Sequence, residues 1–112
     1  PLFISAFNAL NNGCSGNDCI NLELINNGGT TLNILSAQIT LTGVITGTCS
    51  VANTTGLQSW ASGATKTLVF NCGSNSVYSA GANIAGNIQI NYKAQASALT
   101  QTSTGNIRVT VQ

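Results

Sequence analysis

The chain has 112 residues, of which 4% are charged, and its net charge is +1. This length fits one domain over residues 1–112, and folding removes roughly two-thirds of the unfolded surface of such a chain from water. A surface with so little charge creates no field that would concentrate nucleic acid or acidic substrates, which argues against both kinds of partner.

The first expected element is a strand over residues 1–10. Phe3 and Phe7 share one parity and mainly aliphatic residues occupy the other, so both faces of the segment are partly apolar. An edge strand with one wet face should alternate more cleanly. We therefore expect the first strand of the chain's own domain, following a hydrophobic helix upstream of Pro1. The alternative is a donor strand that inserts Phe3 and Phe7 into another copy.

The four cysteines form an even set in a chain without histidine. Cys14 and Cys19 have a C-x4-C spacing that is not that of a zinc knuckle, whereas Cys49 and Cys72 stand alone. Two disulfides are the expected outcome. Four cysteines allow three connectivities, among which proximity favours Cys14 with Cys19 and Cys49 with Cys72. Such bonds indicate an oxidising exterior or a hyperthermophile.

The next expected elements are two strands joined by a turn. Apolar residues at alternate positions of segment 20–24 predict a half-buried strand. The sequence Asn-Asn-Gly-Gly then predicts a tight hairpin, because Asn-Gly tolerates positive φ. The second strand should begin at Thr30 or Thr31. Its apolar parity changes at Ile34 and Leu35, which predicts a β-bulge there.

The remaining strands are short and regularly spaced. Gly43 permits a turn into a strand over residues 44–51, and residues 65–70 predict a strand with both faces partly covered. Alternation over residues 84–92 and 107–111 predicts the last two strands. No segment has the caps and period of a helix. We therefore expect an all-β fold, an antiparallel immunoglobulin-like β-sandwich of about seven strands.

Two loop features are candidate sites. Asn53-Thr54-Thr55 is an N-glycosylation sequon, which requires an accessible loop outside the cytosol. Trp60 precedes a strand and is either a core residue or an exposed contact. Trp60 and Tyr78 join Phe3 and Phe7 as candidate intersubunit contacts.

The sequence provides no catalytic machinery. It has no histidine to act as a base near neutral pH, and its two acids occupy different contexts, Asp18 in a loop and Glu23 on the polar face of a strand. We expect no enzyme, cofactor or metal site. An isopeptide bond from Lys66 or Lys93 to an asparagine, assisted by Glu23, is a further alternative. No stretch approaches the roughly 20 apolar residues of a membrane span, so no membrane contact is expected from this segment.

Three segments carry a resemblance to a known family. They are CINLELINNGGTTLNILSAQITLTG at 19–43, GATKTLVFNCGSNSVYSAGANIAGNIQINYKA at 63–94 and LTQTSTGNIRVTVQ at 99–112. Together they resemble the extracellular β-domain of archaeal type IV pilin-like proteins, the group that includes archaellins and other class III signal-peptide subunits. The resemblance implies a cell-surface filament in which an N-terminal helix forms the filament core.

Three functions remain open from the sequence. The first is a structural subunit of an extracellular archaeal filament of pilus or archaellum type, with copies of itself as partners. The second is a subunit that polymerises by donor-strand exchange through its first strand. The third is a non-polymerising adhesion or glycan-binding module that uses Trp60 and Tyr78, with surface glycans or an S-layer as partners.

Overall fold

The computed structural model describes residues 2–10, 14, 17–43, 45–73 and 80–112, and within residues 2–10 it describes the side chains of Ile4 and Asn8. The described chain forms seven strands and one 3-10 turn, confirming the predicted all-β class. They are β1 Leu2–Leu10, β2 Cys19–Asn26, β3 Leu32–Thr42, β4 Gly47–Ser50, η1 Thr55–Leu57, β5 Thr65–Asn71, β6 Asn83–Ala94 and β7 Gln101–Thr110. No helix in these residues is long and apolar enough to cross a membrane.

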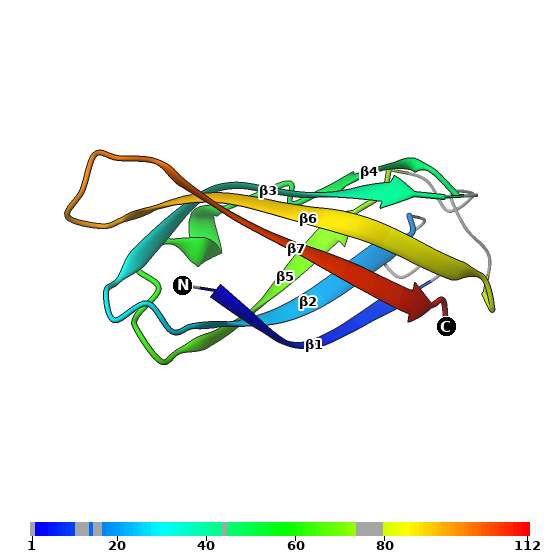
Figure 1. The fold of residues 1–112 in the computed structure, drawn as a ribbon, viewed down its shortest axis with the longest axis horizontal. Helices are drawn as coiled ribbons and strands as arrows, with labels where there is room; N and C mark the ends of the chain where they lie inside the picture. Colours follow the sequence, from blue (N-terminus) through cyan, green and yellow to red (C-terminus); the bar gives the residue numbers. More distant parts are fainter. Residues whose placement is uncertain (1, 11–13, 15–16, 44, 74–79) are drawn as a thin grey trace.

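The strands form one antiparallel sheet in the order β1-β2-β5-β4-β3-β6-β7 (Figure 1). The joint between β4 and β5 is a single residue pair, Ser50 with Asn71. This short joint divides the sheet into two halves, β1-β2-β5 and β4-β3-β6-β7, and the sheet curls on itself. As a result β1 and β7 approach each other at the two ends of the strand order. A Cβ atom placed on Gly105 of β7 would lie 3.7 Å from Ile4 Cδ1 of β1.

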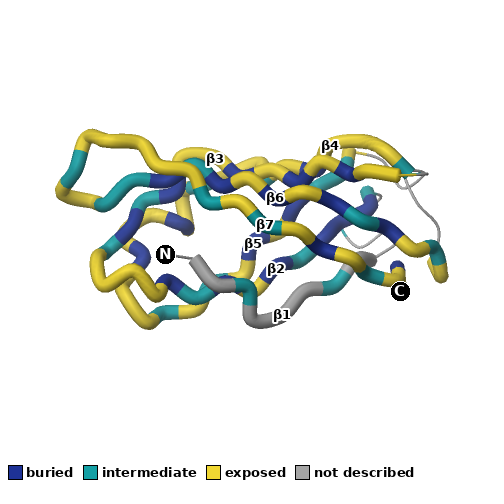
Figure 2. Tube along the Cα trace, in the orientation of Figure 1, coloured by how far each residue is buried: buried dark blue, intermediate teal, exposed yellow. Residues whose placement is uncertain are grey.

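Buried residues alternate with more exposed ones along the strands of both halves (Figure 2), and the buried residues form one core cluster. β2 contributes Ile20, Leu22 and Leu24, and β6 contributes residues of the same kind that include Ile88 and Ile90. The half-buried strand over residues 20–24 and the strand over residues 84–92 are thus confirmed. Burial of each such aliphatic side chain stabilises the fold by about 1.5–3 kcal/mol.

The predicted β-bulge is confirmed. The pairing of β3 with β6 shifts register between Ile34 and Ser36, so Leu35 is the extra residue. Leu35 is 43% exposed, whereas Ile34 and Ala37 on either side are buried. The inserted residue lets both apolar parities of the strand reach the same core.

The predicted hairpin between the second and third strands is wrong. β2 pairs with β1 and β5, and β3 pairs with β4 and β6, so the Asn-Asn-Gly-Gly segment joins the two halves of the sheet. Asn26 is fully buried, and its backbone N–H and C=O bond to Ala64 and Gly63. β3 then begins at Leu32, later than expected.

Three other strands differ from expectation. β5 is covered on one face only, because Leu68 and Phe70 are buried while Val69 is 44% exposed. β4 covers four residues of the expected eight in segment 44–51. β7 begins at Gln101 instead of residue 107, because its first half has no apolar alternation and is held by its ladder with β6.

Candidate functional site

The most extensive polar feature is the outer surface of β4, β3, β6 and β7, which we call the amide–hydroxyl face. Ladder partners point to the same side of a sheet, so the outward residues form rows across the four strands. Nearly all of these side chains end in an uncharged amide or a hydroxyl. The amide and hydroxyl members are Thr48, Ser50, Ser36, Gln38, Thr40, Thr42, Asn83, Asn87, Gln89, Asn91, Thr102, Thr104, Asn106 and Thr110.

Hydrogen bonds connect these rows across the strands. Asn91 Nδ2 donates to Ser36 Oγ at 2.9 Å, and Thr102 Oγ1 donates to Asn91 Oδ1 at 2.9 Å, linking β3, β6 and β7. At the other end Thr110 Oγ1 donates to Asn83 Oδ1 at 2.8 Å. Asn91 uses both its amide nitrogen and its carbonyl oxygen within its row, whereas Asn83 uses its carbonyl oxygen and keeps its amide nitrogen for other partners.

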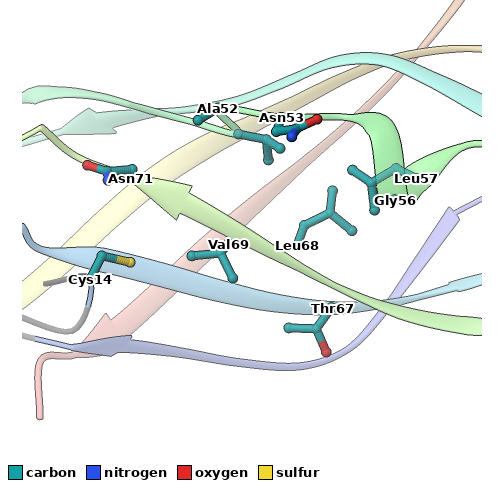
Figure 3. Close-up of a pocket in the computed structure, with 10 residues that line it drawn as sticks. Cys14, Ala52, Asn53, Gly56, Leu57, Thr67, Leu68, Val69 and Asn71 are labelled. Carbon is teal, nitrogen blue, oxygen red and sulfur yellow. The ribbon is translucent and has the colours of Figure 1, made fainter.

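A second feature is a groove of 410 Å³ along β5, on the side where β4 diverges from it (Figure 3). The segment with Ala52 and Asn53 and the turn with Gly56 and Leu57 form one wall. Val69, the exposed valine of β5, lies in the opposite wall. The described residues that line the groove include Val51, Leu57, Leu68 and Val69, so it offers apolar contact.

The predicted sequon lies at the edge of this groove. Asn53 and Thr55 are exposed, and Asn53 Oδ1 accepts a hydrogen bond of 2.8 Å from the Thr55 backbone N–H. This is an Asx turn, in which the asparagine side chain replaces a backbone turn. The carbonyl oxygen is therefore turned toward the chain and the amide nitrogen is at the surface, where a modifying enzyme would need it.

The four candidate contact residues have different outcomes. Trp60 is fully buried, so its assignment as an intersubunit contact is wrong and its core alternative holds. Its indole Nε1–H donates to the Ala64 carbonyl at 2.8 Å, which satisfies the one polar atom of the ring. The side chains of Phe3 and Phe7, and all of Tyr78, lie outside the described residues.

Both predicted disulfides are present, Cys14–Cys19 and Cys49–Cys72. The first closes the loop before β2, and the second joins β4 to the residue after β5, where the ladder between these strands is a single pair. The second bond therefore supplies covalent closure at the weakest joint of the sheet.

The acids are not arranged as a catalytic pair. Asp18 is fully buried, and its backbone carbonyl accepts from the Cys72 N–H, whereas Glu23 is exposed on the outer side of β2. An assisted isopeptide bond needs a buried acid, and the exposed position of Glu23 does not fit that role. Within the described segments, no three histidine, cysteine or acidic residues are grouped to hold a metal.

β1 is held differently from the other strands. It pairs along its length with β2, with a second bulge between Ile4 and Ala6 that the sequence did not predict. Toward β7 the described residues form no ladder, and Ile4 packs near Gly105 instead. Neither disulfide crosslinks β1, because Cys14 and Cys19 both follow it in the chain.

The assembly of amides and hydroxyls into one face was not predicted from the sequence. The available signal was the alternation of Asn and Gln with isoleucine in GNIQIN, and of Thr with other small residues in QTSTGN. The cross-strand rows depend on register, which those segments alone do not specify.

No protein-family model matches the chain, and the search of curated proteins also found no match. Function is therefore inferred from the sequence patterns and from the geometry described above.

Proposed function

We propose that this chain is a structural, non-catalytic subunit of an extracellular archaeal surface filament of pilus or archaellum type. The observation that carries the proposal is the amide–hydroxyl face, a broad sheet surface almost without charge. Burying an ion against a neighbouring subunit costs several kcal/mol unless it is well paired, whereas uncharged amides and hydroxyls can exchange water for partners on a second copy. Such a surface suits repeated contact between subunits.

The strand order supports a finer assignment of the fold. We propose an immunoglobulin-like sandwich, with β1, β2 and β5 in one layer and β3, β6 and β7 in the other. This is the distribution in which the first, second and fifth strands face the third, sixth and seventh. β4 pairs over four residues with β3 and over one with β5, so it belongs with the second layer here.

An extracellular location is supported by the disulfides. Bonds of this kind form and persist outside the reducing cytosol of mesophiles, and they also occur inside hyperthermophiles. A chain with few charged groups gains covalent stabilisation from Cys14–Cys19 and Cys49–Cys72 without relying on ion pairs.

The test is to locate the chain on the cells that produce it. Surface filaments sheared from the cells should contain tryptic peptides of this chain at a level that accounts for the filament mass. Gold-labelled antibody against the folded domain should decorate the filaments along their whole length. Label on the cell body alone, or at filament tips alone, would overturn the structural-subunit proposal in favour of a surface or tip adhesin.

Donor-strand exchange through β1 is a second candidate, favoured by one observation. β1 is the terminal strand of the sheet, it is crosslinked by neither disulfide, and it forms a ladder on one side only in the described residues. A strand held in this way can leave its own sheet and complete another copy's. Sedimentation of the full chain at millimolar concentration separates the two outcomes. A monomer contradicts exchange, and fibres formed by this chain alone support it if they persist in the Arg108→Glu variant.

The adhesion or glycan-binding function was based on two aromatic residues, and one of them is not at the surface. Trp60 is buried in the core and cannot stack on a sugar ring. Tyr78 lies outside the described residues, so no observation favours this function over the filament.

A further inference from the structure

The few charges of the chain are distributed unequally over its surface. Of its two acids, Asp18 is fully buried and Glu23 is exposed on β2. Of its three cations, Arg108 on β7 is exposed, whereas Lys66 and Lys93 are half-buried. β2 and β7 belong to different halves of the curled sheet, so the exposed acid and the exposed guanidinium occupy the outer surfaces of different halves.

Arg108 borders a hollow in the amide–hydroxyl face with a volume of 560 Å³. The register places Ala85 between Thr42 and Arg108 in one row. The Ala85 methyl group is shorter than the side chains on either side of it, so the surface is depressed at this position. Asn83 and Thr110 form the adjoining row. The hollow therefore results from one short side chain flanked by longer polar ones.

Two of the polar groups around this hollow, on Arg108 and Asn83, present donors to a ligand. Arg108 supplies a guanidinium, which has five N–H groups and no acceptor. Asn83 Oδ1 already accepts from Thr110 Oγ1 at 2.8 Å, so the Asn83 amide nitrogen is the part of that side chain left to face a ligand. A carboxylate matches this set, because its two oxygens can accept from a guanidinium and a neighbouring amide together.

We propose that Glu23 of one copy of this chain binds in the hollow beside Arg108 of the next copy, an inference that rests on the proposed filament function. The outer side of β1, β2 and β5 carries Glu23 as its exposed charge, since Lys66 shares the inward parity of Leu68 and Phe70. The amide–hydroxyl face carries Arg108, with Lys93 in an outward position toward its other end. The two surfaces are thus complementary in charge.

Size and symmetry favour the same contact. β3, β6 and β7 together with the short strand β4 give a face of roughly 600 Å² at about 4.8 Å between strands and about 3.4 Å per residue, somewhat below the roughly 800 Å² per partner of a standard interface. Pairing two amide–hydroxyl faces would oppose like charges. Contact between the two different faces is heterologous, and its repetition adds copies in an open row.

A zero-length crosslink tests the contact directly. The full-length Arg108→Lys variant, mixed as nitrogen-15-labelled and unlabelled copies, is treated with a carbodiimide, which joins a carboxylate and an amine as an amide with loss of water. We expect a linked peptide containing residues 23 and 108 that combines both isotopes. Adding Glu23→Gln should abolish it, while Lys66 and Lys93 remain as internal controls. Absence of the mixed-isotope peptide up to millimolar protein overturns the proposal.

Charge reversal provides an independent test. Arg108→Glu and Glu23→Arg should each raise the concentration for half-maximal association by about tenfold, and the double variant should recover most of that loss. Lys66→Glu makes the same change in net charge as Arg108→Glu, and because Lys66 has the inward parity of β5, opposite to that of Glu23, association should be unchanged. Failure of the double variant to recover contradicts the pairing.

The results distinguish a failure of this inference from a failure of the proposed function, and they distinguish a second copy of the chain from a different ligand of Arg108. Chains found along native filaments without a link between residues 23 and 108 would overturn the inference alone, and the link without filament labelling would overturn the filament function alone. Binding of a soluble polyuronate that depends on Arg108, with no link between copies, would overturn the inference in favour of an acidic saccharide.

Discussion

The side-chain amide of Asn26 donates a hydrogen bond of 2.9 Å to the backbone carbonyl of Trp60, a residue 34 positions later in the chain. The same amide donates to the Thr30 carbonyl at 2.8 Å, and Asn26 Oδ1 accepts from the Gly28 N–H at 3.0 Å. One buried side chain thus closes the turn after β2 and joins it to the segment that carries the core tryptophan.

Removal of this side chain should destabilise the fold strongly. Asn26→Ala removes one of the two donors to the buried Trp60 carbonyl, which keeps the Leu32 N–H, and the partners of the Thr30 carbonyl and the Gly28 N–H, which lie in exposed residues that water can reach; we expect a loss of about 1–3 kcal/mol in the free energy of unfolding. Urea denaturation should show a lower midpoint with an unchanged slope. Asn27→Ala is the matched control, because Asn27 is exposed, and its midpoint should stay near that of the parent. Equal midpoints for the two variants would contradict the role of Asn26.

Trp60 should report on the core and not on assembly. It is the only tryptophan of the chain and is fully buried. Its fluorescence should be blue-shifted in the folded chain, poorly quenched by acrylamide, and unchanged when subunits associate. The urea-unfolded chain serves as the exposed reference. Strong acrylamide quenching of the native protein would contradict the burial of Trp60.

The sequence predicted the features that depend on local parity. The change in parity at Ile34 and Leu35 specifies a bulge whatever strand lies beside it, and the register shift occurs there. Alternation likewise identified β2 and β6. Cysteine proximity identified both disulfides, because short loops close at the smallest entropic cost.

Features that depend on which strands become neighbours were not predictable in the same way. Asn-Asn-Gly-Gly suits a hairpin by its local preference. In the structure, however, the buried side chain of Asn26 donates to the backbone carbonyls of residues 30 and 60, and the chain crosses to the other half of the sheet. The first half of β7 has no apolar pattern and is defined by its partner β6. The rows of the amide–hydroxyl face follow from that same register.

The two disulfides should contribute unequally to stability. Chain-entropy arguments give about 3 kcal/mol for Cys49–Cys72, with a sequence separation of 23, and about 2 kcal/mol for Cys14–Cys19, with a separation of 5. The double variant Cys49→Ala with Cys72→Ala should therefore melt at a lower temperature than Cys14→Ala with Cys19→Ala, and burial does not change this order because each pair has one buried cysteine, Cys49 or Cys19. The reverse order would show that the β4–β5 joint does not depend on its covalent bond.

Asn53 should accept a glycan when the chain is exported through a glycosylating pathway. The exposed Asx turn with Thr55 presents the sequon, and intact mass should fall to the unmodified value in Asn53→Gln and in Thr55→Ala. A glycan at this position would lie beside Val69 in the groove and should reduce binding of an apolar dye. Thr54→Ala, which keeps the sequon, is the control. An unmodified parent chain from such a host would contradict the assignment.

Two glycines on the paired strands β6 and β7 should respond oppositely to the same added methyl group. A Cβ atom at Gly86 would lie 2.7 Å from Ile39 Cγ2 and 3.2 Å from the Thr40 carbonyl, so Gly86→Ala must displace the core and should cost about 1–3 kcal/mol.

At Gly105 the nearest atoms are Ile4 Cδ1 at 3.7 Å and Ile88 Cδ1 at 4.0 Å, which is ordinary contact. The residue also borders a gap of 30 Å³ between β1 and β7. Gly105→Ala should therefore fill part of the gap, restrict the unfolded chain, and stabilise the protein by about 0.4–1 kcal/mol. Because the new contact is with Ile4, hydrogen exchange in β1 should slow in this variant and not in Gly86→Ala. Faster exchange in β1 of Gly105→Ala would mean that β1 does not pack against β7 in solution.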